Sequence, residues 1–83
     1  MNERAERIHD WLLAYLAQVV GSPVEDIGID VPFARYGLDS VGMTMMASDL
    51  MDFLEQEIEL DTFFEYPTVE ALSHHLAGAA RQG

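Results

Sequence analysis

The stretch Tyr36-Gly37-Leu38-Asp39-Ser40-Val41 forms a polar corner directly before a long segment with helical periodicity. Glycine permits a tight backbone turn, and aspartate and serine are residue types that begin helices. Apolar side chains then recur at helical spacing, at Met43, Met46, Ala47, Leu50 and Leu54. We therefore expect Ser40 to lie exposed at a helix N-terminus, where free N–H groups and the helix dipole favour a phosphate group. A simpler role for Ser40, as the N-cap of the helix, is the alternative.

Much of the remaining chain is also predicted to be helical, which gives an all-α fold. The predicted helices are residues 3–20, 40–57, 61–65 and 68–78. Thr68 is the expected N-cap of the last helix. The inward-facing stripe of the first helix consists of Ile8, Leu12, Tyr15, Leu16 and Val19, with Trp11 on its flank. Residues 1–83 are few enough to form one small domain.

Residues 21–39 form a long connection whose prolines and glycines exclude a continuous helix. Apolar residues alternate with other types within it, but the chain has no second strand-like run to pair with them. A connection of this length in a small domain is normally pinned or functional. We therefore predict a loop strapped over the helices by apolar anchors, with Phe33 as the deepest.

The charge balance restricts the class of partner. Fifteen acidic residues stand against four arginines and no lysine, which gives a net charge of −11. Such a surface repels nucleic-acid phosphates and anionic lipids, and it speeds encounter with basic protein surfaces. The chain has no cysteine, no apolar run that could span a bilayer and no signal peptide at its N-terminus. We expect a monomeric, cytoplasmic protein that binds no nucleic acid and spans no membrane.

No catalytic or metal-binding set can be recognised in the sequence. His74 and His75 are adjacent, so local helical spacing cannot bring both to one metal ion. Ser40 has no histidine in its motif to activate it, and the motif differs from the Gly-x-Ser-x-Gly elbow of hydrolases. The acidic residues lack the spacing of a calcium loop. Ser40 therefore fits a residue that another enzyme modifies, and the chain is expected not to be an enzyme.

Three motifs follow one another over most of the chain. Pro32-Phe33 and Tyr36-Gly37-Leu38-Asp39-Ser40 make up the first, Phe63-Phe64-Glu65-Tyr66-Pro67-Thr68-Val69 the second, and Glu70-Ala71-Leu72-Ser73-His74-His75-Leu76 the third. Together they resemble the attachment site, the link into the last helix and the last helix of acyl carrier proteins, in particular the carrier domains of polyketide synthases. The resemblance implies a four-helix bundle with a long first loop and a short third helix.

The resemblance also implies a function. Ser40 would carry a 4′-phosphopantetheine arm, installed from coenzyme A by a phosphopantetheinyl transferase. Gly37, Leu38 and Asp39 would complete the attachment site. Asp39 would help to hold the metal ion of the transferase and to dock that enzyme. The thiol of the arm would hold acyl intermediates as thioesters in polyketide or fatty acid biosynthesis. Its further partners would be an acyl-loading ligase or acyltransferase, a ketosynthase and other tailoring enzymes with basic surfaces.

The outer face of the second predicted helix is the expected docking surface for these enzymes. It consists of Val41, Thr44, Met45, Ser48, Asp49 and Asp52. Val41 stands where the family usually has leucine, and this departure bears on which partners dock.

Two alternatives remain at this stage. Within the family, aspartate before the serine favours an acyl carrier over a peptidyl carrier without excluding the latter. From another class, the chain could be an acidic helical adaptor that binds basic partners without a prosthetic group. The adaptor predicts that Ser40→Ala keeps function, whereas charge reversal at Asp49 and Asp52 abolishes it.

Overall fold

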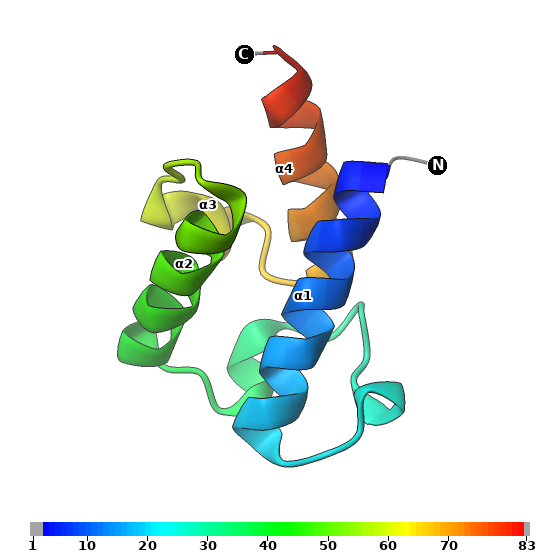
Figure 1. Cartoon of the computed structure of the whole chain (residues 1–83). Helices are drawn as coiled ribbons and strands as arrows, with labels where there is room; N and C mark the ends of the chain where they lie inside the picture. Colours follow the sequence, from blue (N-terminus) through cyan, green and yellow to red (C-terminus); the bar gives the residue numbers. More distant parts are fainter. Residues whose placement is uncertain (1–2, 83) are drawn as a thin grey trace.

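The computed structural model describes residues 3–82, with side chains for residues 3–78. The elements in chain order are α1 (Glu3–Val20), the 3₁₀ turns η1 (Val24–Asp26) and η2 (Phe33–Tyr36), α2 (Ser40–Leu54), α3 (Leu60–Glu65) and α4 (Val69–Gln82). Helix α1 packs against α4, and the short α3 packs against α2 (Figure 1). Residues 3–82 contain no strand, so the all-α prediction is confirmed.

The core receives apolar side chains from every helix and from the long loop. Phe33 from the loop and Phe63 from α3 are the largest side chains without exposed surface. The predicted stripe of α2 is buried at Met43, Met46, Ala47 and Leu50 and half-buried at Leu54. The predicted stripe of α1 is correct except at Val19, which is 46% exposed. Residues 20–26, which follow Val19, also lie largely at the surface.

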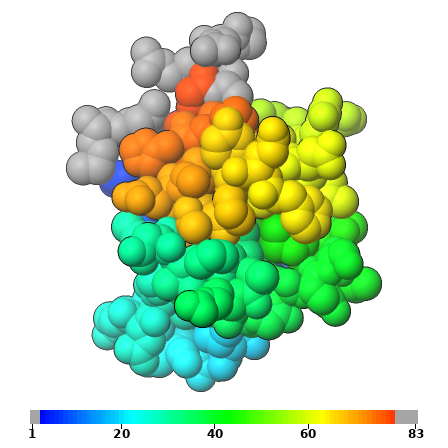
Figure 2. All heavy atoms as spheres, turned by 180° about the vertical axis from the view of Figure 1, so that it is seen from behind, coloured from blue at the N-terminus to red at the C-terminus, as the bar shows by residue number. Residues whose placement is uncertain are grey.

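Backbone hydrogen bonds fix the long loop to the start of α4. The Phe33 N–H donates to the Pro67 carbonyl at 2.8 Å, and the Glu70 N–H donates to the Ile29 carbonyl at 3.0 Å. The second bond satisfies one of the N–H groups that a helix start leaves free. Figure 2 shows the loop residues, in teal, directly below the start of α4. The predicted strap is therefore correct, and Phe33 is its deepest anchor.

Four helix ends differ from the predicted ones, and one of them is the start of α4, at Val69 and not at residue 68. Helix α2 ends at Leu54, not at residue 57, because Glu55 adopts the left-handed conformation with φ of 53°. The Gln56 N–H then donates to the Met51 carbonyl at 3.1 Å, which closes the helix. Helix α3 begins at Leu60, one residue earlier than expected. Helix α4 continues to Gln82 instead of ending at residue 78, because alanines flank the helix-weakening glycine at position 78.

Replacement of Glu55 by glycine is expected to stabilise the protein. A side chain in the left-handed region is strained, and glycine is not, so Glu55→Gly should raise the free energy of unfolding by about 0.5–1 kcal/mol. Urea unfolding followed by circular dichroism measures the change. Glu55→Gln removes the charge but keeps the Cβ atom, so it should not reproduce the gain. An equal gain in both variants would assign the effect to charge.

Candidate functional site

A left-handed turn leads the chain from η2 into α2. Gly37 follows η2 with φ of 84°, and its N–H donates to the Ala34 carbonyl at 3.1 Å. A Cβ atom at Gly37 would meet no other atom within 4 Å. The backbone conformation, not a lack of space, is therefore what favours glycine in this corner.

Asp39 is the N-cap of α2. Its carboxylate accepts a hydrogen bond from the Gly42 N–H at 2.8 Å, and its carbonyl accepts one from the Met43 N–H at 2.8 Å. Gly42 fits closely into this turn, since a Cβ atom there would lie 3.0 Å from Leu38 Cδ2 and 3.4 Å from the Asp39 carboxylate. The alternative of Ser40 as N-cap is therefore wrong, because the neighbouring aspartate has that role.

Ser40 occupies the first helical position of α2 and is exposed, as predicted. Within residues 3–78 its hydroxyl has no hydrogen-bond partner. The N–H groups of Ser40 and Val41 also lack an intrahelical acceptor, because a helix leaves its first N–H groups free. The dipole of α2 adds positive potential at the same place. The corner thus presents a hydroxyl beside a site suited to a phosphate group.

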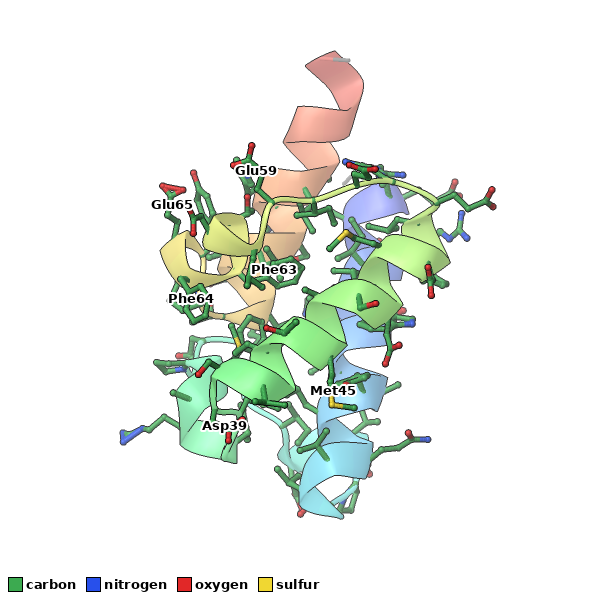
Figure 3. All side chains as sticks on the ribbon, turned by 90° about the vertical axis from the view of Figure 1, so that its left-hand side faces the viewer. Asp39, Met45, Glu59, Phe63, Phe64 and Glu65 are labelled. Atoms are coloured by element: carbon green, nitrogen blue, oxygen red, sulfur yellow. The ribbon has the colours of Figure 1, made fainter. Side chains whose placement is uncertain are left out.

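A hollow of about 210 Å³ lies beside Ser40. Its walls come from the loop, from the start of α2 and from α3, at Pro32, Phe33, Ala34, Leu38, Asp39, Ser40, Met43, Phe63, Phe64 and Pro67. Most of these side chains are apolar. Phe64 is 53% exposed, whereas Phe63 is buried (Figure 3). The hollow can therefore take an apolar portion of a group attached to Ser40.

The remaining residues predicted for this site fall into two groups. Leu38 is buried, so it supports the first turn of α2 and contributes only a wall of the hollow. All the predicted docking residues of α2 are exposed: Val41, Thr44, Met45, Ser48, Asp49 and Asp52. Figure 3 shows Met45 on the outer side of α2, in front of α1. The Thr44 hydroxyl donates to the Ser40 carbonyl at 2.8 Å and so braces the first turn.

The histidines form no metal site within residues 3–78. His9 and His74 line one hollow of about 300 Å³ between α1 and α4, and His75 stacks on Tyr66 with ring centroids 4.0 Å apart. No group of three or more potential ligands assembles among the described residues. No helix in this part of the chain is long and apolar enough to cross a membrane.

Most of the chain is similar to known proteins. The family model described as phosphopantetheine attachment site matches residues 10–76. The chain is 33% identical over 67 residues to polyketide synthase PksL of Bacillus subtilis (strain 168), a match that covers 81% of this chain and 2% of PksL. It is 30% identical over 73 residues to acyl carrier protein TtuC of Teredinibacter turnerae, covering 88% of this chain and 84% of TtuC. The chain thus spans most of TtuC and only a small part of the synthase.

Two solved structures resemble the fold closely. An acyl carrier protein from Anabaena sp. PCC 7120, with a variant phosphopantetheinylation-site sequence, superposes with a TM-score of 0.87 and 27% identity. That match covers 93% of this chain and 88% of the other. A free-standing peptidyl carrier protein from Acinetobacter baumannii gives a TM-score of 0.82 and 28% identity, covering 95% of this chain and 99% of the other.

Proposed function

Because this chain belongs to the phosphopantetheine-attachment family, we propose that Ser40 is the residue that receives the 4′-phosphopantetheine group. The chain is a carrier protein, similar to the carriers of polyketide synthases. The exposed hydroxyl of Ser40, at the start of α2, is the observation that supports this assignment most directly. The attached group supplies a thiol that holds acyl chains as thioesters.

The residues around Ser40 fit such a group. The free N–H groups at the start of α2 suit a phosphodiester, and the net dipole of the helix acts in the same direction. The apolar hollow formed by Phe33, Met43 and Phe64 suits the less polar part of the group. Asp39 caps the helix, so one of its oxygens already holds the backbone beside the attachment point.

Carrier families are generally non-catalytic, and we extend this to the present chain. In our proposal it is the substrate of a phosphopantetheinyl transferase and performs no chemistry itself. The arrangement at Ser40 supports this view, because its hydroxyl has no hydrogen-bonded base within the described residues. Tethering then raises the effective concentration of the acyl chain for each enzyme that the carrier meets.

Carriers of this family work with polyketide synthase enzymes. For this chain we propose an acyl-loading ligase or acyltransferase and a ketosynthase, which dock on the exposed side of α2. The acidic surface favours enzymes with basic docking sites. Acyl rather than peptidyl cargo is part of the proposal, supported by Asp39 and by the polyketide relatives. A cytoplasmic location remains a prediction, and the adaptor without a prosthetic group no longer fits a member of this family.

The proposal is tested by measuring whether phosphopantetheine becomes attached to the protein. The protein is incubated with coenzyme A and a broad-specificity phosphopantetheinyl transferase, and its intact mass is measured. We expect a gain equal to one phosphopantetheine, and fragmentation should assign this gain to a peptide that contains Ser40. A folded protein that takes up no such group, or takes it up elsewhere, would refute the proposal.

Two substitutions of Asp39 separate the effect of its hydrogen bond as N-cap from the effect of its negative charge. Asp39→Ala removes the acceptor for the Gly42 N–H, and the free energy of unfolding should fall by about 1 kcal/mol. Asp39→Asn keeps an oxygen acceptor and should lose only a few tenths of a kcal/mol. If the carboxylate charge also serves the transferase, both variants should be modified more slowly. Equal stability of all three proteins would contradict the capping role.

A further inference from the structure

Three aromatic rings stack at the surface where α1 meets α2. Trp11 lies 5.2 Å from Tyr15 and 5.8 Å from Phe53, measured between ring centroids, with interplanar angles of 23° and 22°. Trp11 and Tyr15 are half-buried, and Phe53 is 39% exposed. We call this group the aromatic face. The site around Ser40 uses none of these rings.

Exposed apolar residues extend the aromatic face along α1. Val19 follows Tyr15 by one helical turn and is 46% exposed, and Val20 is 37% exposed. A shallow hollow of about 190 Å³ opens at Trp11 and Tyr15. Exposed apolar side chains beside stacked rings on a small acidic protein are typical of an interaction site. Tryptophan and tyrosine are also the residues that most often dominate binding energy in protein interfaces.

Charged groups border the aromatic face on both sides. Burial, and then the nearby Asp49 carboxylate, raise the pKa of the Tyr15 hydroxyl above its usual value. Asp49 is exposed, so its charge faces solvent beside the ring. On the other side, the Arg7 guanidinium lies over Phe53 at 5.7 Å from the ring centroid. Arg7 thus shows within the chain that a guanidinium packs on the Phe53 ring.

The aromatic face is continuous with the start of α2. Val41, Met45, Asp49 and Phe53 follow one another at four-residue intervals and are all exposed. Residues at this spacing are neighbours on a helix surface, so they form one line that turns gradually round α2. The line covers about 20 Å of helix, at 1.5 Å per residue. An enzyme that follows this line from Val41 reaches Phe53 about a third of a turn further round the helix.

We propose that the aromatic face is a docking surface for an arginine-bearing, otherwise apolar segment of a partner enzyme. The inference rests on the proposed function, because that function requires enzymes to approach α2. The guanidinium would pack on the rings and pair with Asp49, while aliphatic side chains cover the exposed valines. A second copy of the chain is a poor occupant, because each copy carries a net charge of −11.

The test uses the whole protein and a defined probe. The probe is a short amphipathic helical peptide with arginine along one edge and leucine along the other. The same peptide with citrulline in place of arginine is its control. Trp11 is the only tryptophan in the chain, so its fluorescence reports directly on the aromatic face. Amide chemical shifts in ¹⁵N-labelled protein locate the peptide independently.

We expect the arginine peptide to change the Trp11 emission and to shift amides of residues 7–19 and 49–53. Phe53→Ala should weaken binding about tenfold, as for a residue that contributes strongly to an interface. Phe53→Leu keeps apolar volume and should also weaken binding, which covers the case in which the alanine variant unfolds. Phe64→Ala removes a ring of α3 that is even more exposed than Phe53, and it should change the affinity less than about twofold.

Several results of these experiments would contradict the proposed docking surface. Shifts confined to α3 and the start of α2, an unchanged Trp11 emission, or equal binding of Phe53→Leu and wild type would overturn the docking surface. Equal binding of the citrulline peptide would also overturn it, because the rings would then not select a guanidinium. Attachment of phosphopantetheine is measured separately on the same samples. A protein that accepts the group but not the peptide disproves the docking surface and leaves the function of Ser40 intact.

Discussion

Ser40→Ala is expected to abolish the uptake of phosphopantetheine completely. The substitution removes the hydroxyl that would form the phosphodiester and leaves the Asp39 cap in place. Because Ser40 is exposed at the first helical position, its loss should change the free energy of unfolding by less than about 0.5 kcal/mol. Intact mass after incubation with coenzyme A and transferase gives the result, and circular dichroism checks the fold.

Ser48→Ala is the matched control. Ser48 is also an exposed serine of α2, but it lies in the middle of the helix, where the N–H groups are bonded to carbonyls. It therefore lacks the free N–H groups that favour a phosphate at Ser40. We expect Ser48→Ala to gain the full mass of the group, because the hydroxyl of Ser40 remains. A mass gain in Ser40→Ala, or its loss in Ser48→Ala alone, would contradict the assignment.

Local sequence signals predicted most of the fold. The inward stripes of α1 and α2 repeat at helical spacing, and Thr68 caps α4 by accepting a hydrogen bond from the Ala71 N–H at 3.1 Å. These features depend on residues a few positions apart, so a sequence contains them directly. The errors lie where distant residues decide. Val19 fits the periodicity of α1, yet it is 46% exposed, because periodicity does not tell whether another element covers a helix position.

The candidate site was predictable for similar reasons, with one exception. The corner before α2 is local, so its turn at Gly37 and the exposure of Ser40 followed from residue types. The choice between Asp39 and Ser40 as N-cap did not, since both types cap helices equally well. In the structure Asp39 has this role, because its carboxylate accepts the hydrogen bond from the Gly42 N–H.

The position of the long loop depends on contacts that cannot be recognised in the sequence. Tyr36 both donates to the Gly28 carbonyl at 2.9 Å and accepts from the Gly28 N–H at 2.8 Å through its hydroxyl. No pattern in the sequence marks this pair. The aromatic face was missed as well, since Trp11 and Tyr15 were assigned to the core and Phe53 belongs to a different helix. Periodicity describes one helix at a time and cannot reveal a stack across two helices.

Substitution by alanine should destabilise the protein far more at Phe63 than at its neighbour Phe64, although both lie in α3. Phe63→Ala empties a site with no exposed surface, so it should lower the free energy of unfolding by about 3–5 kcal/mol. A domain of this size has a total stability near the lower end of about 5–15 kcal/mol. The variant should therefore be partly unfolded at room temperature, with loss of helical circular dichroism and a transition at much lower urea.

Phe64→Ala provides the control for this loss. It makes the identical chemical change one residue later, in the same short helix, but at a side chain that is 53% exposed. The loss in free energy of unfolding should stay below about 1 kcal/mol. Helix propensity changes equally in both variants, so the difference between them isolates burial. Similar losses in the two variants would mean that α3 is not anchored through Phe63. Since Phe64 also lines the hollow beside Ser40, its folded alanine variant can report on the attached group without a stability defect.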